Sequence, residues 1–176
     1  MDLNNKNIQW IILILLAFTW GSSFILMKLS LRTLDLYQVA AFRIFISFVL
    51  FIPLTIRHFK KLNWQNLPFL LIVGFIGNAI PAFLFTTAQT KIDSSMAGIL
   101  NSLTPLSALL IGMYIFKENT RWINIIGVIT ALIGAIGLMV EDNLATFFNG
   151  ANWYALFVVL AAFFYGISVN VIKHKL

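Results

Sequence analysis

The chain has 176 residues, of which 60% are hydrophobic and 10% are charged, and its mean hydropathy is +0.92. Because a soluble globular domain usually has about 25% charged residues, this composition excludes water as the main solvent of the protein surface. The chain has no cysteine, which excludes disulfides, thiolate metal sites and cysteine nucleophiles. The net charge of +6 lies mostly in short segments between apolar runs, where it indicates membrane topology rather than nucleic-acid binding.

Six long apolar runs follow one another along the chain. Each can supply the roughly 20 residues that cross a hydrocarbon core about 30 Å thick. Runs without alternation must be helical, because lipid offers no hydrogen-bond partners to an open backbone. The second run is interrupted only by Arg43. The sequence predicts an all-α, polytopic membrane protein with helices at about residues 8–31, 37–57, 67–87, 94–116, 122–140 and 153–176.

Lysine and arginine are distributed unequally between the two surfaces that these helices define. With a cytoplasmic N-terminus, eight of the 12 positive residues lie inside and only Arg32 and Lys91 lie outside, while Lys28 and Arg43 fall within helices. The positive-inside rule favours this orientation. We therefore expect a multi-pass protein of the cell membrane, specifically the bacterial inner membrane. Residues 141–152, which include no Lys or Arg, are the expected external linker.

A motif in the first predicted helix recurs in the sixth. Residues 17–23 (AFTWGSS) match residues 162–168 (AFFYGIS), and Lys28 matches Lys173, so the offset is 145 residues throughout. A repeat of five helices is odd, so the second copy enters the membrane from the opposite side, as in the inverted repeats of many secondary transporters. We interpret residues 1–140 as a first repeat and residues 153–176 as the first helix of an incomplete second repeat.

Two explanations of this incomplete repeat stay open. In the first, the chain is truncated and the C-terminal half is missing. In the second, it is a naturally half-size, non-transporting subunit that assembles with a second half or with another copy of itself. The eight-to-two distribution of positive residues argues against an antiparallel homodimer, because such a dimer requires a weak charge bias.

Several motifs, taken together, resemble those of one transporter family. They are residues 18–24 (FTWGSSF) with Lys28, residues 41–43 (AFR), residues 94–98 (SSMAG) with the later Pro105 and Lys117-Glu118, and residues 127–138. In this order and spacing they are similar to the EamA family of the drug/metabolite transporter superfamily. The resemblance implies a ten-helix, two-repeat carrier with cytoplasmic termini that exports amino acids, metabolites or drugs by alternating access. The chain departs from the family at residues 36–40 (LYQVA), which lack the proline common there.

Arg43 is the first candidate for the substrate path. A guanidinium inside a membrane-spanning helix needs a partner or a water-filled cavity, and its planar fork of donors suits a carboxylate. Alternatively, the side chain extends to the outer surface or pairs with Asp35. Lys28, near the outer end of the first helix, is a gate or a structural anchor. Trp20 and Ser23 are candidates for contact with an apolar or aromatic solute, with core packing as the alternative.

Two prolines interrupt the third and fourth predicted helices. Pro81 and Pro105 remove backbone donors and predict kinks, so both are candidate hinges. Carbonyl groups freed by a proline in a membrane must be satisfied by neighbours or water. Asn78 and Asn101 lie beside these kinks and are candidates for polar walls of the substrate path. Plain helix packing is the alternative for all four residues.

Catalytic motifs are absent from the sequence. All six Asp and Glu residues map to helix ends or loops, so this chain offers no intramembrane carboxylate for a proton relay or a sodium site. It has no phosphate-binding loop, no metal-ligand cluster and no paired nucleophile and base. We therefore expect no enzymatic activity, no cofactor and no bound metal. The expected partners are the lipid bilayer and a small-molecule solute.

Overall fold

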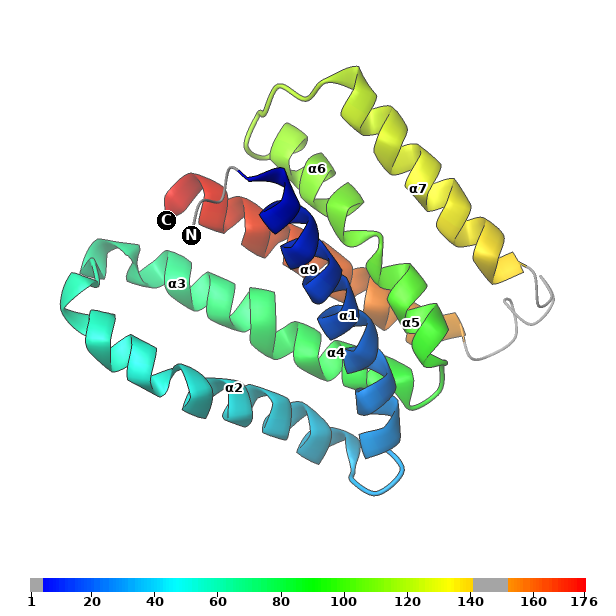
Figure 1. Ribbon diagram of the computed structural model, residues 1–176, viewed down its shortest axis with the longest axis horizontal. Helices are drawn as coiled ribbons and strands as arrows, with labels where there is room; N and C mark the ends of the chain where they lie inside the picture. Colours follow the sequence, from blue (N-terminus) through cyan, green and yellow to red (C-terminus); the bar gives the residue numbers. More distant parts are fainter. Residues whose placement is uncertain (1–4, 141–151) are drawn as a thin grey trace.

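The computed structural model describes residues 5–140 and 152–176. Every regular element in these residues is helical (Figure 1), which confirms the predicted all-α class. The elements are α1 (Lys6–Ser30), α2 (Leu36–His58), η1 (Phe59–Lys61), η2 (Trp64–Asn66), α3 (Leu67–Gly74), η3 (Phe75–Ala79), α4 (Ile80–Gln89), α5 (Ser94–Asn101), α6 (Thr104–Tyr114), α7 (Trp122–Val140) and α9 (Asn152–Lys175).

Five helical segments of the described chain are long and apolar enough to cross a membrane. They are Lys6–Ser30, Leu36–His58, Trp64–Gln89, Ser94–Tyr114 and Trp153–Lys175. The helix α7, with 19 residues and no charged side chain, is not one of these five, so a sixth crossing by residues 122–140 stays a prediction. The expected linker at 141–152 falls almost entirely outside the described residues.

Short polar side chains mark where several helices begin. The Asn5 side chain accepts a hydrogen bond from the Asn7 amide at 3.0 Å, just before α1. At the start of α2, the Gln38 side chain accepts a hydrogen bond from the Asp35 amide at 3.0 Å. The Asn63 side chain accepts the Gln65 amide at 3.0 Å and begins η2. These contacts satisfy backbone donors that have no partner inside the helix.

The third and fourth predicted helices are interrupted at their prolines. The segment Trp64–Gln89 includes the π-helix η3, directly before Pro81 in the first turn of α4. The segment Ser94–Tyr114 is divided into α5 and α6, and Pro105 lies in the first turn of α6. A proline ring removes one backbone donor and crowds the preceding turn, so each irregularity falls where the sequence places that conflict.

The helix α9 lies at the centre of the bundle, against α4 and α6 (Figure 1). A Cβ atom on Gly166 would lie 2.8 Å from the Ala108 amide nitrogen, so the α6 and α9 backbones touch at this crossing. The Asn170 side-chain amide reinforces it by donating to the Ala108 carbonyl oxygen at 2.8 Å. On the opposite side, Ser168 packs directly against Gly77 of η3. Glycine allows this approach because it has no side chain at the contact.

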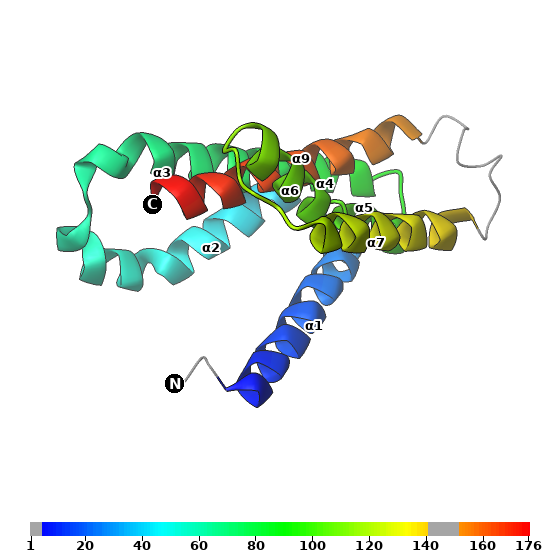
Figure 2. The same cartoon turned by 90° about the horizontal axis from the view of Figure 1, so that it is seen from above.

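The helix α1 packs on the bundle only near its C-terminal end. The Phe24 ring lies 5.6 Å from the Phe85 ring of α4, and the Ser94 hydroxyl donates to the Phe24 carbonyl oxygen at 3.2 Å. Met27 is 3% exposed and belongs to the hydrophobic core. The N-terminal part of α1 projects away from the other helices (Figure 2). The bundle therefore holds the C-terminal end of α1, and the other described helices do not pack on its N-terminal part.

Candidate functional site

Arg43 projects from α2 into a partly buried region between helices. Its Nη1 donates to the Met27 sulfur of α1 at 3.5 Å. The Thr86 hydroxyl of α4 donates to the same sulfur at 3.5 Å and to its own-helix Ala82 carbonyl oxygen at 2.7 Å. A thioether is a weak acceptor, so it satisfies little of the guanidinium. Among the described residues no carboxylate pairs with Arg43, and the pairing with Asp35 that the sequence left open does not occur.

An aromatic group lies next to this cation. The Phe85 ring is 5.6 Å from Phe24 and 5.9 Å from Tyr165 of α9. These three rings pack in the same hydrophobic cluster as Met27, the hydrogen-bond partner of Arg43. Helices α1, α2, α4 and α9 thus bring together a guanidinium, a phenol and two apolar rings. Such a group can hold a solute that combines an anionic end with an apolar body.

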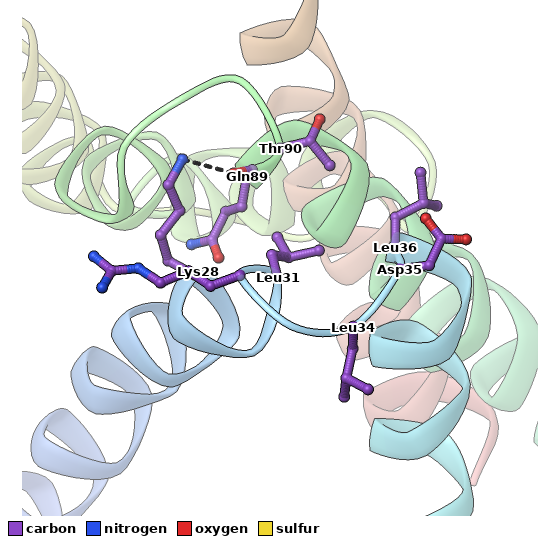
Figure 3. Close-up of a pocket in the computed structure, with 8 residues that line it drawn as sticks. Lys28, Leu31, Leu34, Asp35, Leu36, Gln89 and Thr90 are labelled. Atoms are coloured by element: carbon purple, nitrogen blue, oxygen red, sulfur yellow. Dashed lines mark hydrogen bonds between the residues drawn. The ribbon is translucent and has the colours of Figure 1, made fainter.

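A small pocket of about 260 Å³ lies at the predicted outer end of the bundle, between α1, α2 and α4 (Figure 3). Lys28 lies on one side, where its Nζ donates to the carbonyl oxygens of Gln89 and Ile92, both at 2.8 Å. Asp35 lies on the other side, at the start of α2. The Gln89 side chain is fully buried, and no described protein group bonds to either of its amide atoms. Polar side chains therefore line the pocket together with the leucines Leu31, Leu34 and Leu36.

The remaining predicted residues do not converge on Arg43 in the described chain. Trp20 is 63% exposed, and the Ser23 hydroxyl donates to the Trp20 carbonyl oxygen at 2.7 Å within α1. The Asn78 side chain donates to the Val73 carbonyl oxygen at 3.4 Å. Asn101 accepts a hydrogen bond from the Thr104 hydroxyl at 3.1 Å, across the break between α5 and α6. Their roles in a substrate path stay predictions.

A second polar cluster joins the loop after α6 to the end of α9. Lys117 has a positive φ of 55°, a conformation that non-glycine residues rarely adopt, and the turn brings Glu118 toward α9. The Glu118 carboxylate lies 2.6 Å from Lys173 Nζ and 2.5 Å from His174 Nε2. These hydrogen bonds, first from Lys173 and then from His174, lower the pKa of Glu118 below its usual 4.5. The cluster connects α6 to α9 at the predicted cytoplasmic surface.

No group of three or more potential metal ligands occurs in the part of the chain that the structure describes. The two candidate regions are a partly buried cation beside aromatic rings and a pocket of mixed lining at a helix junction. Both regions have side chains that can contact a small solute.

The relationship to known proteins follows from comparison of the whole chain. Residues 8–140 match the model of the EamA-like transporter family. The chain belongs to this family. Its described helices, five of them long enough to span a membrane, fit that membership. EamA family membership associates the chain with transport of a solute across a membrane.

Several curated relatives share this segment. An uncharacterized transporter of Archaeoglobus fulgidus is 27% identical over 128 residues, which are 73% of this chain and 46% of the relative. One of Haemophilus influenzae is 29% identical over 148 residues, or 82% of this chain and 47% of the relative. Protein PagO of Salmonella typhimurium is 21% identical over 155 residues, 86% and 50% of the two chains. The chain thus spans about half the length of these relatives, and no solved structure matches it.

Sequence reasoning missed three residues of the candidate site of this EamA chain: Phe85, Thr86 and Tyr165. Phe85 and Thr86 lie in an apolar run where no motif distinguishes them from packing residues. Tyr165 could have been found, because it is the repeat partner of Trp20, which the sequence did single out. A candidate on one copy of a repeat also nominates its partner on the other copy.

Proposed function

We propose that this chain forms the first repeat, and the first helix of the second, of an alternating-access carrier that exports a small organic solute with an anionic group, such as an amino acid or a related metabolite. Its N-terminus lies in the cytoplasm of a bacterial cell, and its membrane is the inner membrane. The solute enters between α1, α2, α4 and α9. Pro81 and Pro105 act as hinges, and Lys28 anchors the outer end of α1.

The observation that carries this proposal is the state of Arg43. A cation within a membrane-spanning helix is retained only where a partner or water compensates it, and here the guanidinium donates to the Met27 sulfur. A solute carboxylate would supply the missing acceptors, and the neighbouring Phe85 and Tyr165 rings would contact the rest of the solute. Trp20, Ser23, Asn78 and Asn101 extend the path toward the two surfaces in this proposal.

The test is flux in proteoliposomes made with the complete gene product. Labelled amino acids, small mono- and dicarboxylates and uncharged analogues are offered to wild type and to Arg43→Gln. Losing a hydrogen bond to a charged group costs about 1.5–3 kcal/mol, so flux of carboxylate solutes should fall by at least about tenfold. Flux of uncharged analogues should change less.

Arg57→Gln is the matched control, because Arg57 is an exposed arginine at the end of the same helix. That variant should transport like wild type. Wild-type flux of every transported carboxylate by both Arg43→Gln and Asn101→Ala would refute the site. An equal loss in Arg57→Gln would show that the effect is one of charge or topology and not of binding.

A further inference from the structure

The two copies of the repeated motif have opposite environments. In the apolar 18-residue window of each helix, 44% of α9 is buried, whereas 6% of α1 is buried. At the offset of 145 residues, positions buried on α9 correspond to exposed positions on α1. The pairs, with their exposed fractions, are Ala155 (7%) with Trp10 (65%), Val158 (0%) with Leu13 (55%), and Ala161 (0%) with Leu16 (41%).

The glycine pair shows the same contrast. A Cβ atom on Gly166 would collide with the backbone of Ser107 and Ala108, both at 2.8 Å, so this residue lies at a close helix crossing. Its repeat partner Gly21 has no neighbouring atom within 4 Å of the same position. The motif therefore carries a close-packing residue in both helices, and only one copy is packed.

We propose that one face of α1 packs into the groove between the third and fourth helices of a second, inverted repeat, as α9 packs between α4 and α6 here. This α1 docking face consists of Trp10, Leu13, Leu16, Ala17 and Gly21. The first helix of each repeat then packs against the other repeat, so the two repeats exchange their first helices at two symmetric contacts. The proposal rests on the inverted-repeat architecture of the proposed function.

The occupant is a second repeat and not a second copy of this chain. In a second copy the corresponding groove is already filled by that copy's own α9, whose Asn170 bonds across it to Ala108. A second repeat, in contrast, has a groove with no first helix of its own. The curated relatives are about twice as long as the segment they share with this chain, which leaves room for such a repeat.

Side-chain size further defines the contact. The α9 residues in the groove are small, whereas their α1 partners Trp10, Leu13 and Leu16 are large. Helices approach closely where small residues face each other. The docked α1 therefore comes closest to its groove near Ala17 and Gly21, and the groove is wider toward the N-terminal end of α1.

The experiment is photo-crosslinking in membranes with the complete gene product. The photoreactive amino acid benzoylphenylalanine replaces Leu13 in one variant and Leu16 in another, and adducts are mapped by mass spectrometry. Phe18 provides the matched control on the same helix, because its repeat partner Phe163 is 43% exposed. We expect protein adducts from positions 13 and 16 to lie in the third and fourth helices of a second repeat. The adducts at position 18 should be with lipid.

Three results would overturn the docking proposal. They are adducts from positions 13 and 16 with lipid alone, adducts with α2 to α9 of the same chain, and adducts with a second copy. The readout does not depend on transport. Adducts without carboxylate flux would leave the docking standing and refute the proposed function, while flux without the expected adducts would refute the docking alone.

Discussion

The helices α1 and α9 carry the same motif and have similar hydrophobicity. The other helices surround α9 but pack only on the C-terminal part of α1 (Figures 1 and 2). In lipid, apolar surface alone gives no reason for two helices to associate. What holds α9 is specific: a glycine at a backbone contact, an asparagine bonded across the crossing and a charged pair at its end. The packing of a helix in this bundle therefore depends on specific contacts with its partner and not on its own composition.

The largest effect is expected when the glycine of each motif copy, Gly166 on α9 and Gly21 on α1, is replaced by a larger residue. Gly166→Leu places a side chain into the Ser107 and Ala108 backbone and should destabilise the chain by about 1–3 kcal/mol or more. In this chain without a second repeat, the Gly21→Leu variant should have the same stability as wild type. The measurement is the thermal midpoint in detergent by fluorescence-detected gel filtration.

Gly74→Leu is the control for the added bulk, because Gly74 is a helical glycine that also has no atom within 4 Å of a Cβ position. It should behave like Gly21→Leu. Equal destabilisation by the Gly166 and Gly21 substitutions would mean that the two copies are packed alike, contrary to the structure.

A smaller effect is expected from Asn170→Leu, which keeps the side-chain size. The substitution removes donations to the carbonyl oxygens of Ala108 and Gly166, each at 2.8 Å. Polar contacts between membrane helices contribute about 0.6–2 kcal/mol, so denaturation in detergent should shift by about that amount. The repeat partner Ile25 is 57% exposed, and Ile25→Leu should have no effect. Wild-type stability of Asn170→Leu would remove the hydrogen bond from the explanation of why α9 is held.

The end of α1 provides the third test. Lys28→Met removes the donor to the Gln89 and Ile92 carbonyl oxygens, and with it two hydrogen bonds between the end of α1 and the end of α4. Backbone amides around residues 24–30 should exchange faster with deuterium, while those of α9 should not change. Lys91→Met, an exposed lysine nearby, is the control. Unchanged exchange in α1 would contradict the proposed anchor.

The smallest effect concerns pH. Because folding lowers the pKa of Glu118 through its contacts with Lys173 and His174, this carboxylate stabilises the folded state above its usual pKa of 4.5 and loses that contribution as the pH falls through the lowered value. Thermal midpoints measured from pH 7 to pH 3 should decline less in Glu118→Gln than in wild type. Parallel declines in the two proteins would show that this cluster does not contribute.

The sequence predicted the helices well for a physical reason and their packing poorly for another. Length and charge-free runs decide which segments form helices in lipid, so the all-α class followed directly. The buried face of each helix was harder to predict from the sequence. Alanines such as Ala155, Ala161 and Ala162 are common in so apolar a chain, and they do not indicate which face of the helix contacts a partner. The repeat offset connects Gly21 to Gly166, but the sequence alone does not show that one is packed and the other bare.

The candidate site was predicted in part. Arg43 is conspicuous as a charge inside an apolar run, and the structure adds that no carboxylate of the described residues pairs with it. Phe85 and Thr86 could not be chosen, since their importance comes from the fold bringing α4 against α2 and α9. Asn78 and Asn101 were chosen because each is polar and lies beside a proline. Their side chains instead form local hydrogen bonds with Val73 and Thr104. Residue spacing does not reveal whether an asparagine bonds locally or faces a solute.

The central position of α9 also has a consequence for the order in which the helices assemble during synthesis. Chains emerge N-terminus first, so α4 and α6 enter the membrane before the helix that fills the space between them. Until α9 is inserted, the surfaces around Gly77 and Ala108 must be covered by lipid or by the insertion machinery. A nascent chain that ends before residue 152 therefore lacks the helix that packs against both α4 and α6.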